Sequence, residues 1–169
     1  MAKIFKEIDP QQIKGNPFKL IGKDWMLITA GTPESFNTMT ANWGGLGFLW
    51  NKNVCFCVVR PTRHTYNFID KSGYFTLSFF EEKYREILNF CGSTSGKNVN
   101  KVAETGLTPV TGKDAIYFEE ARLVLECRKI YFHDINPKHF LYPEIDGFYP
   151  KKDYHRMYIG EIIRCLVKD

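Results

Sequence analysis

Short apolar runs with the alternation typical of β-strands recur along the chain, and no long helix separates them. Pro61 ends one such run, and Gly-Thr-Pro ends another. Short helices are expected over 63–71, 81–90 and 100–104. The absence of regular crossover helices argues against a doubly wound parallel sheet and favours a mainly β barrel with helical insertions. We expect strands over 25–31, 53–60, 74–80, 118–132 and 156–167, and an extended stretch over 37–49.

The length of 169 residues suits one domain, which we take to span 1–169. Hydrophobic residues make up 44% of the chain and charged residues 25%, which excludes a disordered chain. Aromatic residues reach 15%, with 14 Phe and 9 Tyr, which is more than a minimal core needs. This excess predicts a planar ligand, a large flat interface, or both.

Charge and hydropathy exclude several classes of partner and location. The formal net charge is +4, and acidic and basic residues interleave, so we expect no nucleic-acid binding. No run of about 18 apolar residues could span a membrane, and no apolar stretch follows the N-terminal charges as a signal peptide requires. The five cysteines are an odd number, and we interpret them as buried, reduced thiols of a cytoplasmic protein.

Common catalytic and metal-binding motifs are missing from the sequence. The glycines of 44–47 lie in a β context and do not mark a dinucleotide fold. Residues 92–98 resemble a phosphate loop, but one residue is missing between the glycines and Asn ends it, so we reject an NTPase and keep an anion-binding loop open. Cys91 has no local activator, and no residue is firmly catalytic. Cys55 and Cys57 lack a second ligand pair, so no metal site is predicted.

Three segments, 37–45, 60–65 and 93–97, are unusually polar for their β surroundings. In the first, small hydroxyl and amide residues would leave backbone donors and acceptors accessible to a flat polar ring such as that of a flavin. In the second, Arg60 and Arg63 lie at the start of a helix, where guanidinium groups and backbone amides suit a phosphate. Each segment alone is also compatible with a solvated turn. Together they favour a binding site.

Five sequence blocks follow one another from about residue 25 to 163, and only the ordered set is specific. They are Asn-Thr-Met-Thr-Ala-Asn-Trp-Gly-Gly (37–45), Val-Arg-Pro-Thr-Arg-His-Thr-Tyr (59–66), Ser-Gly-Lys-Asn-Val-Asn-Lys (95–101, followed by Thr-Gly-Leu-Thr-Pro), Leu-Val-Leu-Glu-Cys (123–127) and His-Arg-Met-Tyr-Ile-Gly-Glu (155–161). With these blocks the chain resembles the flavin reductase-like, FMN-binding split-barrel proteins, and among them the flavoredoxin-type group.

The resemblance implies a six-stranded antiparallel Greek-key split barrel, a homodimer, and one FMN per subunit near the dimer interface. His155 and Trp43 would lie at a nicotinamide. Lys97 stands where the family has Arg, which keeps the charge and loses the bidentate fork. Carried over by position, and together with the polar segments, the residues expected at FMN are Asn37, Thr38, Met39, Thr40, Ala41, Arg60, Arg63, Thr65, Tyr66, Ser95, Gly96 and Lys97.

The function implied by the resemblance is an oxidoreductase that passes electrons through FMN. NADH or NADPH would be the donor, and a free flavin, a small molecule or a redox protein the acceptor. One alternative is an FMN-binding electron carrier with no nicotinamide site, and another is a barrel that binds no flavin. Residues 136–154, with three Pro and one Gly, are expected to form a long loop or arm that covers the flavin or reaches across the dimer.

Overall fold

The computed structural model describes residues 4–168, so residues 1–3 and 169 of the predicted domain lie outside it. The strands are β1 (Lys6–Ile8), β2 (Met26–Thr32), β3 (Ser35–Ala41), β4 (Gly44–Leu49), β5 (Lys52–Val59), β6 (Tyr74–Phe79), β7 (Pro109–Thr111), β8 (Ile116–Phe118), β9 (Leu123–Asp134) and β10 (Arg156–Val167). The helices are α1 (Pro17–Lys19), α2 (His64–Lys71), α3 (Arg85–Ser93) and α4 (Lys101–Thr105), with short turns η1 (Pro10–Gln12), η2 (Leu20–Asp24), η3 (Glu82–Tyr84), η4 (Pro137–His139) and η5 (Pro143–Phe148).

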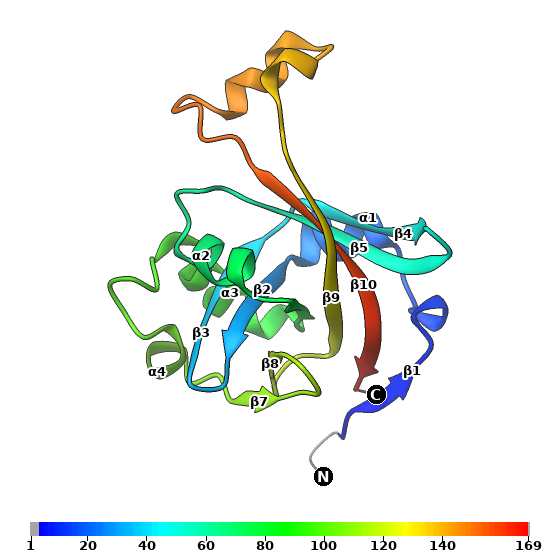
Figure 1. Cartoon of the computed structure of the whole chain (residues 1–169). Coiled ribbons are helices and arrows are strands. Elements are labelled where there is room, and N and C mark those ends of the chain that lie inside the picture. The colour runs from blue at the N-terminus through cyan, green and yellow to red at the C-terminus, as the bar shows by residue number, and fades with distance from the viewer. Residues whose placement is uncertain (1–3, 169) are drawn as a thin grey trace.

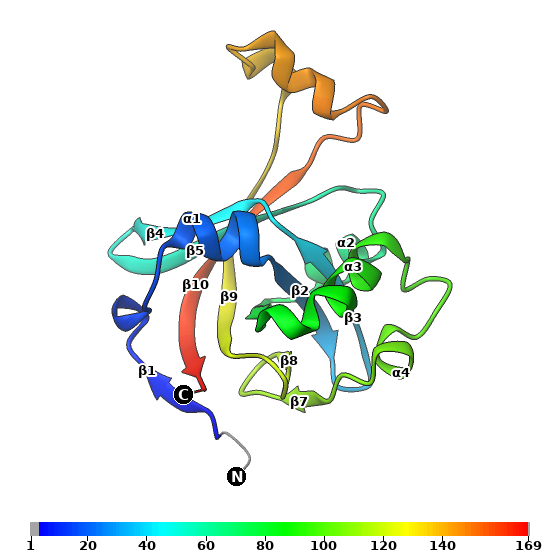
Figure 2. The ribbon, with the colours of Figure 1, turned by 180° about the vertical axis from the view of Figure 1, so that it is seen from behind.

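Eight strands form one antiparallel sheet in the order β3-β2-β6-β9-β10-β5-β4, with β1 added on β10. The strands β3 and β4 are at opposite ends of this order, although only residues 42 and 43 separate them in the chain. The sheet must therefore curl until its two edges come together, as Figures 1 and 2 show. This is the split barrel that the sequence predicted.

Within residues 4–168 the structure contains four strands beyond the six that were predicted. The six predicted strands correspond to the continuous run β3-β2-β6-β9-β10-β5; β4 extends this run beyond β5, and β1 pairs with β10 beside it. The extended stretch over 37–49 divides into two strands at residues 42 and 43, and Gly44, the first residue of β4, comes very close to β5. A Cβ there would lie 2.5 Å from the Phe56 carbonyl oxygen. The short strands β7 and β8 pair separately.

Both faces of the sheet are buried at β2 and β6, which explains the apolar runs there. On β2, Met26, Ile28 and Ala30 point into the barrel core, whereas Leu27 packs on the outer core. The cysteines follow the same alternation, since Cys55 and Cys57 lie together in the barrel core and Cys91 lies in the outer core. All five thiols are buried and unbridged, as predicted.

Helices α2 and α3 pack against β2 and β3, while a separate segment extends from the far ends of β9 and β10. This segment is residues 136–154, here called the arm, and it contains η4 and η5. In both views it stands away from the rest of the sheet (Figures 1 and 2). The prediction of a long irregular excursion at these residues agrees with the structure.

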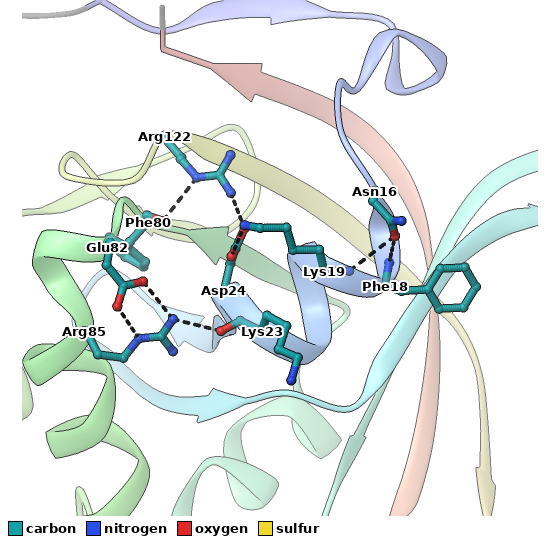
Figure 3. Close-up of polar contacts among 9 residues, drawn as sticks. All are labelled: Asn16, Phe18, Lys19, Lys23, Asp24, Phe80, Glu82, Arg85 and Arg122. Carbon is teal, nitrogen blue, oxygen red and sulfur yellow. Dashed lines mark hydrogen bonds and ion pairs between the residues drawn. The ribbon is translucent and has the colours of Figure 1, made fainter.

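A charged cluster joins the N-terminal turns to α3 and to the start of β9 (Figure 3). Asp24 forms ion pairs with Lys19 at 2.6 Å and with Arg122 at 2.9 Å. Arg85 pairs with Glu82 and also donates to a backbone carbonyl of η2 at 2.8 Å. We call this group the Asp24 cluster. No helix within residues 4–168 is long and apolar enough to cross a membrane.

Candidate functional site

Two adjoining pockets lie where β3, the end of β5 and the start of α2 meet. The arm-side pocket has a volume of ≈ 200 Å³ and the loop-side pocket ≈ 180 Å³, and they share Met39 and Arg63. The arm-side pocket is lined by the predicted residues Met39, Thr40, Ala41, Trp43, Arg60, Arg63 and His155. The loop-side pocket is lined by the predicted residues Asn37, Met39, Arg63, Thr65, Ser95 and Gly96.

The loop-side pocket is shaped by a close contact between the loop at Gly96 and β3. The Asn37 side chain donates a 2.7 Å hydrogen bond from Nδ2 to Thr65 Oγ1, which ties β3 to the first turn of α2. A Cβ on Gly96 would lie 1.9 Å from Asn37 Oδ1, so only Gly fits there without displacement. Three segments far apart in sequence are thereby held together around one pocket.

Arg63 and Lys101 bring two partly buried positive charges to the loop-side pocket. Arg63 donates from Nη1 to the Gly92 carbonyl at 2.9 Å. Lys101, only 5% exposed, donates from Nζ to the carbonyls of Thr38 at 2.7 Å and Cys91 at 2.8 Å. Within residues 4–168 neither cation has a carboxylate partner. Burial lowers the pKa of Lys101 to about 8 and also lowers that of Arg63.

Arg60 faces the arm-side pocket but is engaged by the arm. Its Nη1 pairs with Asp153 at 2.8 Å, and Nη2 donates to the Phe148 carbonyl at 2.8 Å. The guanidinium also lies over the Tyr149 ring, 4.8 Å from its centroid. The arm therefore supplies a counter-charge and a platform for Arg60, in contrast to Arg63.

His155 and Trp43 form one wall of the arm-side pocket with help from the arm. Their rings are 5.2 Å apart, and the Phe148 ring meets Trp43 edge-on at 5.6 Å. The Nδ1 atom of His155 is 2.8 Å from the Tyr149 hydroxyl. Burial, followed by the charge of Arg60, lowers the pKa of His155 to about 4, so the imidazole is neutral at pH 7.

Three predicted residues lie outside both pockets. The Thr38 side chain is buried within the sheet, where Oγ1 is 2.9 Å from Thr29 Oγ1. Tyr66 packs against the barrel core and lies under the Arg156 guanidinium. Lys97 lines a neighbouring, larger depression of ≈ 610 Å³ instead. Their predicted roles at FMN stay predictions.

Sequence reasoning missed Lys101, Tyr149 and Asp153. Lys101 was visible as the final residue of the third block, but its burial depends on tertiary packing. Tyr149 and Asp153 lie in the arm, and their contacts with Arg60 are not marked by any local sequence pattern. Within residues 4–168 there is no group of three or more His, Cys, Asp or Glu that could hold a metal ion.

The family model described as flavin reductase like domain matches residues 19–169 of the chain. Flavoredoxin of Desulfovibrio vulgaris (Miyazaki F) is 29% identical, with a TM-score of 0.66 over 85% of this chain and 68% of that one. Flavoredoxin from Methanosarcina acetivorans is 22% identical, with a TM-score of 0.65 over 84% and 67%. The NADH:FAD oxidoreductase SgcE6 of Streptomyces globisporus is 16% identical, with a TM-score of 0.66 over 86% and 77%, and shares the fold. No curated protein matches the chain.

Proposed function

The chain belongs to the flavin reductase-like family, in its flavoredoxin-type group, and from this premise we propose that it binds FMN and transfers electrons through it. The observation that carries the proposal is the pair of adjoining pockets. One has a wall of aromatic and aliphatic side chains, and the other has two cations that pair with no carboxylate within residues 4–168. A planar ring joined to a phosphate has this same combination of parts.

The residues of the pockets suit the two ends of FMN. Arg63 and Lys101 would hold the phosphate, because each needs an anion to offset its buried charge. Gly96 leaves room for a close approach of backbone amides. Met39, Thr40 and Ala41 would place the backbone of β3 along the ring. FMN supplies hydride and electron transfer, and the chain supplies position and electrostatics.

We infer that the electron donor is NADH or NADPH and that it enters on the arm side. Trp43 offers a 39% exposed ring for stacking, and His155 offers a neutral imidazole beside it. The acceptor is a free flavin, a small molecule or a redox protein. A homodimer suits the exposed aromatics Phe48, Trp50 and Phe56 near the β4–β5 hairpin.

A second candidate, an FMN electron carrier without a nicotinamide site, is favoured by one contact. The Phe148 ring rests against Trp43 at 5.6 Å and occupies part of the wall on which a nicotinamide would stack. If the arm keeps this position, electrons reach the flavin from a protein partner rather than from a dinucleotide.

The visible spectrum of the purified protein, with and without added FMN, tests the proposal. We expect bound flavin bands that bleach when NADH or NADPH is added without air. Bands that bleach with dithionite but with neither nicotinamide would select the electron carrier. If FMN does not bind under any condition, both functions are wrong and only the fold is shared.

A further inference from the structure

The arm holds His155 through a single buried hydrogen bond, and this contact has a chemical consequence. We propose that Tyr149 is a positioning residue that fixes His155 as a neutral imidazole with Nε2–H facing the arm-side pocket. There it donates to an acceptor oxygen of the second substrate, such as the carboxamide oxygen of a nicotinamide. The identity of that substrate rests on the proposed function, whereas the state of the imidazole does not.

Packing holds the Tyr149 ring in one place. It is only 3% exposed and lies between the Phe140 ring at 6.2 Å and the Tyr154 ring at 4.9 Å. The Arg60 guanidinium lies over it. A side chain enclosed in this way keeps its hydroxyl at one point, 2.8 Å from Nδ1 of His155.

The direction of this hydrogen bond follows from the partners of the hydroxyl. Burial raises the pKa of Tyr149, so the hydroxyl keeps its proton. The hydroxyl is buried, so its proton needs an acceptor within the protein. Within residues 4–168, His155 Nδ1 is the one group that forms a hydrogen bond with this hydroxyl, so it alone can take that proton. The hydroxyl therefore donates to Nδ1, and the imidazole proton must reside on Nε2.

The Nε2 atom is the part of His155 that a ligand can reach. Within the described residues, Ser78 has the only buried side-chain polar atom without a partner. Nε2 makes no hydrogen bond there either, so it must be accessible, and His155 lines the arm-side pocket. An accessible N–H donor on a pocket wall is ready for an incoming acceptor.

The charges around His155 keep the ring neutral. Arg60 acts against its protonation, and Asp153 acts in favour of it, but Asp153 is itself paired with Arg60 at 2.8 Å. Burial is the larger cause of the lowered pKa of His155, and the charge of Arg60 adds to it. A neutral donor beside the Trp43 ring favours a planar group with a carbonyl oxygen over a cation or a hydrogen-bond donor.

Imidazole nitrogen NMR of the ¹⁵N-labelled protein without flavin tests the state of His155. Its signals are identified among the four histidines by their loss in His155→Gln. We expect one protonated nitrogen, Nε2, and a bare Nδ1 near pH 7. Tyr149→Phe should convert this into a mixture of both tautomers. The matched control Tyr154→Phe, which removes a hydroxyl bonded to Asp146 in the same arm, should leave the signals unchanged.

A double-mutant cycle with the flavin-loaded protein tests the role of Tyr149. Tyr149→Phe should raise the KM for NADH or NADPH about tenfold with little change in kcat, and Tyr154→Phe less than twofold. A Gln side chain at position 155 can place an amide N–H close to where the His155 Nε2–H lies in the wild type, and it does not need Tyr149 to do so. In the His155→Gln background, Tyr149→Phe should therefore have no further effect on KM.

The two measurements separate the possible failures. A wild-type protein with the proton on Nδ1, or a charged ring at pH 7, overturns the inference, because it needs no variant to fold. If Tyr149→Phe raises the KM equally in the wild-type and His155→Gln backgrounds, the positioning role of Tyr149 is overturned. Another outcome is that the expected tautomer is present while neither NADH nor NADPH bleaches the flavin. In that case the assignment of the second substrate as a nicotinamide fails, and so does the carboxamide oxygen as the hydrogen-bond acceptor of His155.

Discussion

The Asp24 cluster and the loop-side pocket both gather cations, but only the first pairs them with carboxylates. In the Asp24 cluster, Arg122 and Lys19 share one carboxylate, and Arg85 pairs with Glu82 (Figure 3). Arg85 also stacks on Trp25. In the loop-side pocket, Arg63 and Lys101 donate only to backbone carbonyls within residues 4–168.

This difference distinguishes a structural clamp from a binding site. Paired charges at the surface hold segments together, and each pair contributes modestly to the free energy of unfolding. A cation buried without a counter-ion costs stability, and an incoming anion can recover that cost as affinity. The cations of the pocket are therefore expected to govern ligand binding, and those of the Asp24 cluster to govern folding.

The largest expected effect is on Arg63. Arg63→Gln should weaken FMN binding about 100-fold, because one or two charge-assisted hydrogen bonds to the phosphate are lost. The free energy of unfolding without FMN should fall little. Arg122→Gln is the matched control and should do the reverse, since it loses its bond to Asp24 and leaves the pocket intact. Fluorescence titration of FMN and urea unfolding measure the two quantities, and equal effects of both variants would remove the distinction.

The pH dependence of FMN affinity should show whether Lys101 binds the phosphate. FMN affinity should fall as the pH rises above about 8, approaching tenfold per pH unit, because the deprotonated amine no longer attracts the phosphate. Without FMN the contribution of Lys101 has the opposite sign: the unfolded chain holds a proton that the folded chain has lost, so the stability of the wild type relative to Lys101→Met should rise with pH between about 8 and the usual lysine pKa. FMN titrations and urea unfolding from pH 7 to 10 measure both. In Lys101→Met the loss of FMN affinity with rising pH should disappear, and an unchanged affinity profile would assign that loss to another group.

Substitutions in the Asp24 cluster should change the free energy of unfolding and leave FMN affinity unchanged. Asp24→Asn removes the carboxylate shared by Lys19 and Arg122 and should lower the free energy of unfolding by roughly 1 to 2 kcal/mol. High salt should shrink this difference, because the exposed Lys19 pair is screened. Urea unfolding at low and high salt measures it. A change of FMN affinity beyond twofold in this variant would show that the two regions are coupled.

Much of the fold and part of the site could be predicted from the sequence because both depend on local patterns. Alternation fixed the six long strands, and the polar residues on β3 and at Arg60 to Thr65 marked the pockets. Neighbours on a helix point about 100° apart, so Thr65 faces the loop-side pocket while Tyr66 turns toward the barrel core. The sequence motif contains both residues, so it could not indicate that only Thr65 faces the pocket.

The rest of the site depends on contacts between distant segments. Asp153 meets Arg60 across 93 positions, and Tyr149 reaches His155 only because the arm turns back on the strand end. The depressed pKa values of Lys101 and His155 come mainly from burial, which no residue type reveals by itself. Long-range packing of this kind cannot be read from sequence spacing.

The smallest expected effect concerns the geometry of the pocket rather than its charge. In Gly96→Ala the new Cβ would meet Asn37 Oδ1 at 1.9 Å, so either the loop or the Asn37 side chain, with its bond to Thr65, must be displaced. FMN affinity should fall several-fold to about tenfold, with about 1 kcal/mol lost in stability. Gly73→Ala is the matched control, because its Cβ would meet nothing within 4 Å, and it should change neither quantity. Because no charge is altered, a loss confined to Gly96→Ala would show that the cations act only when this loop holds the pocket in shape, whereas an unchanged affinity would mean that Arg63 and Lys101 suffice.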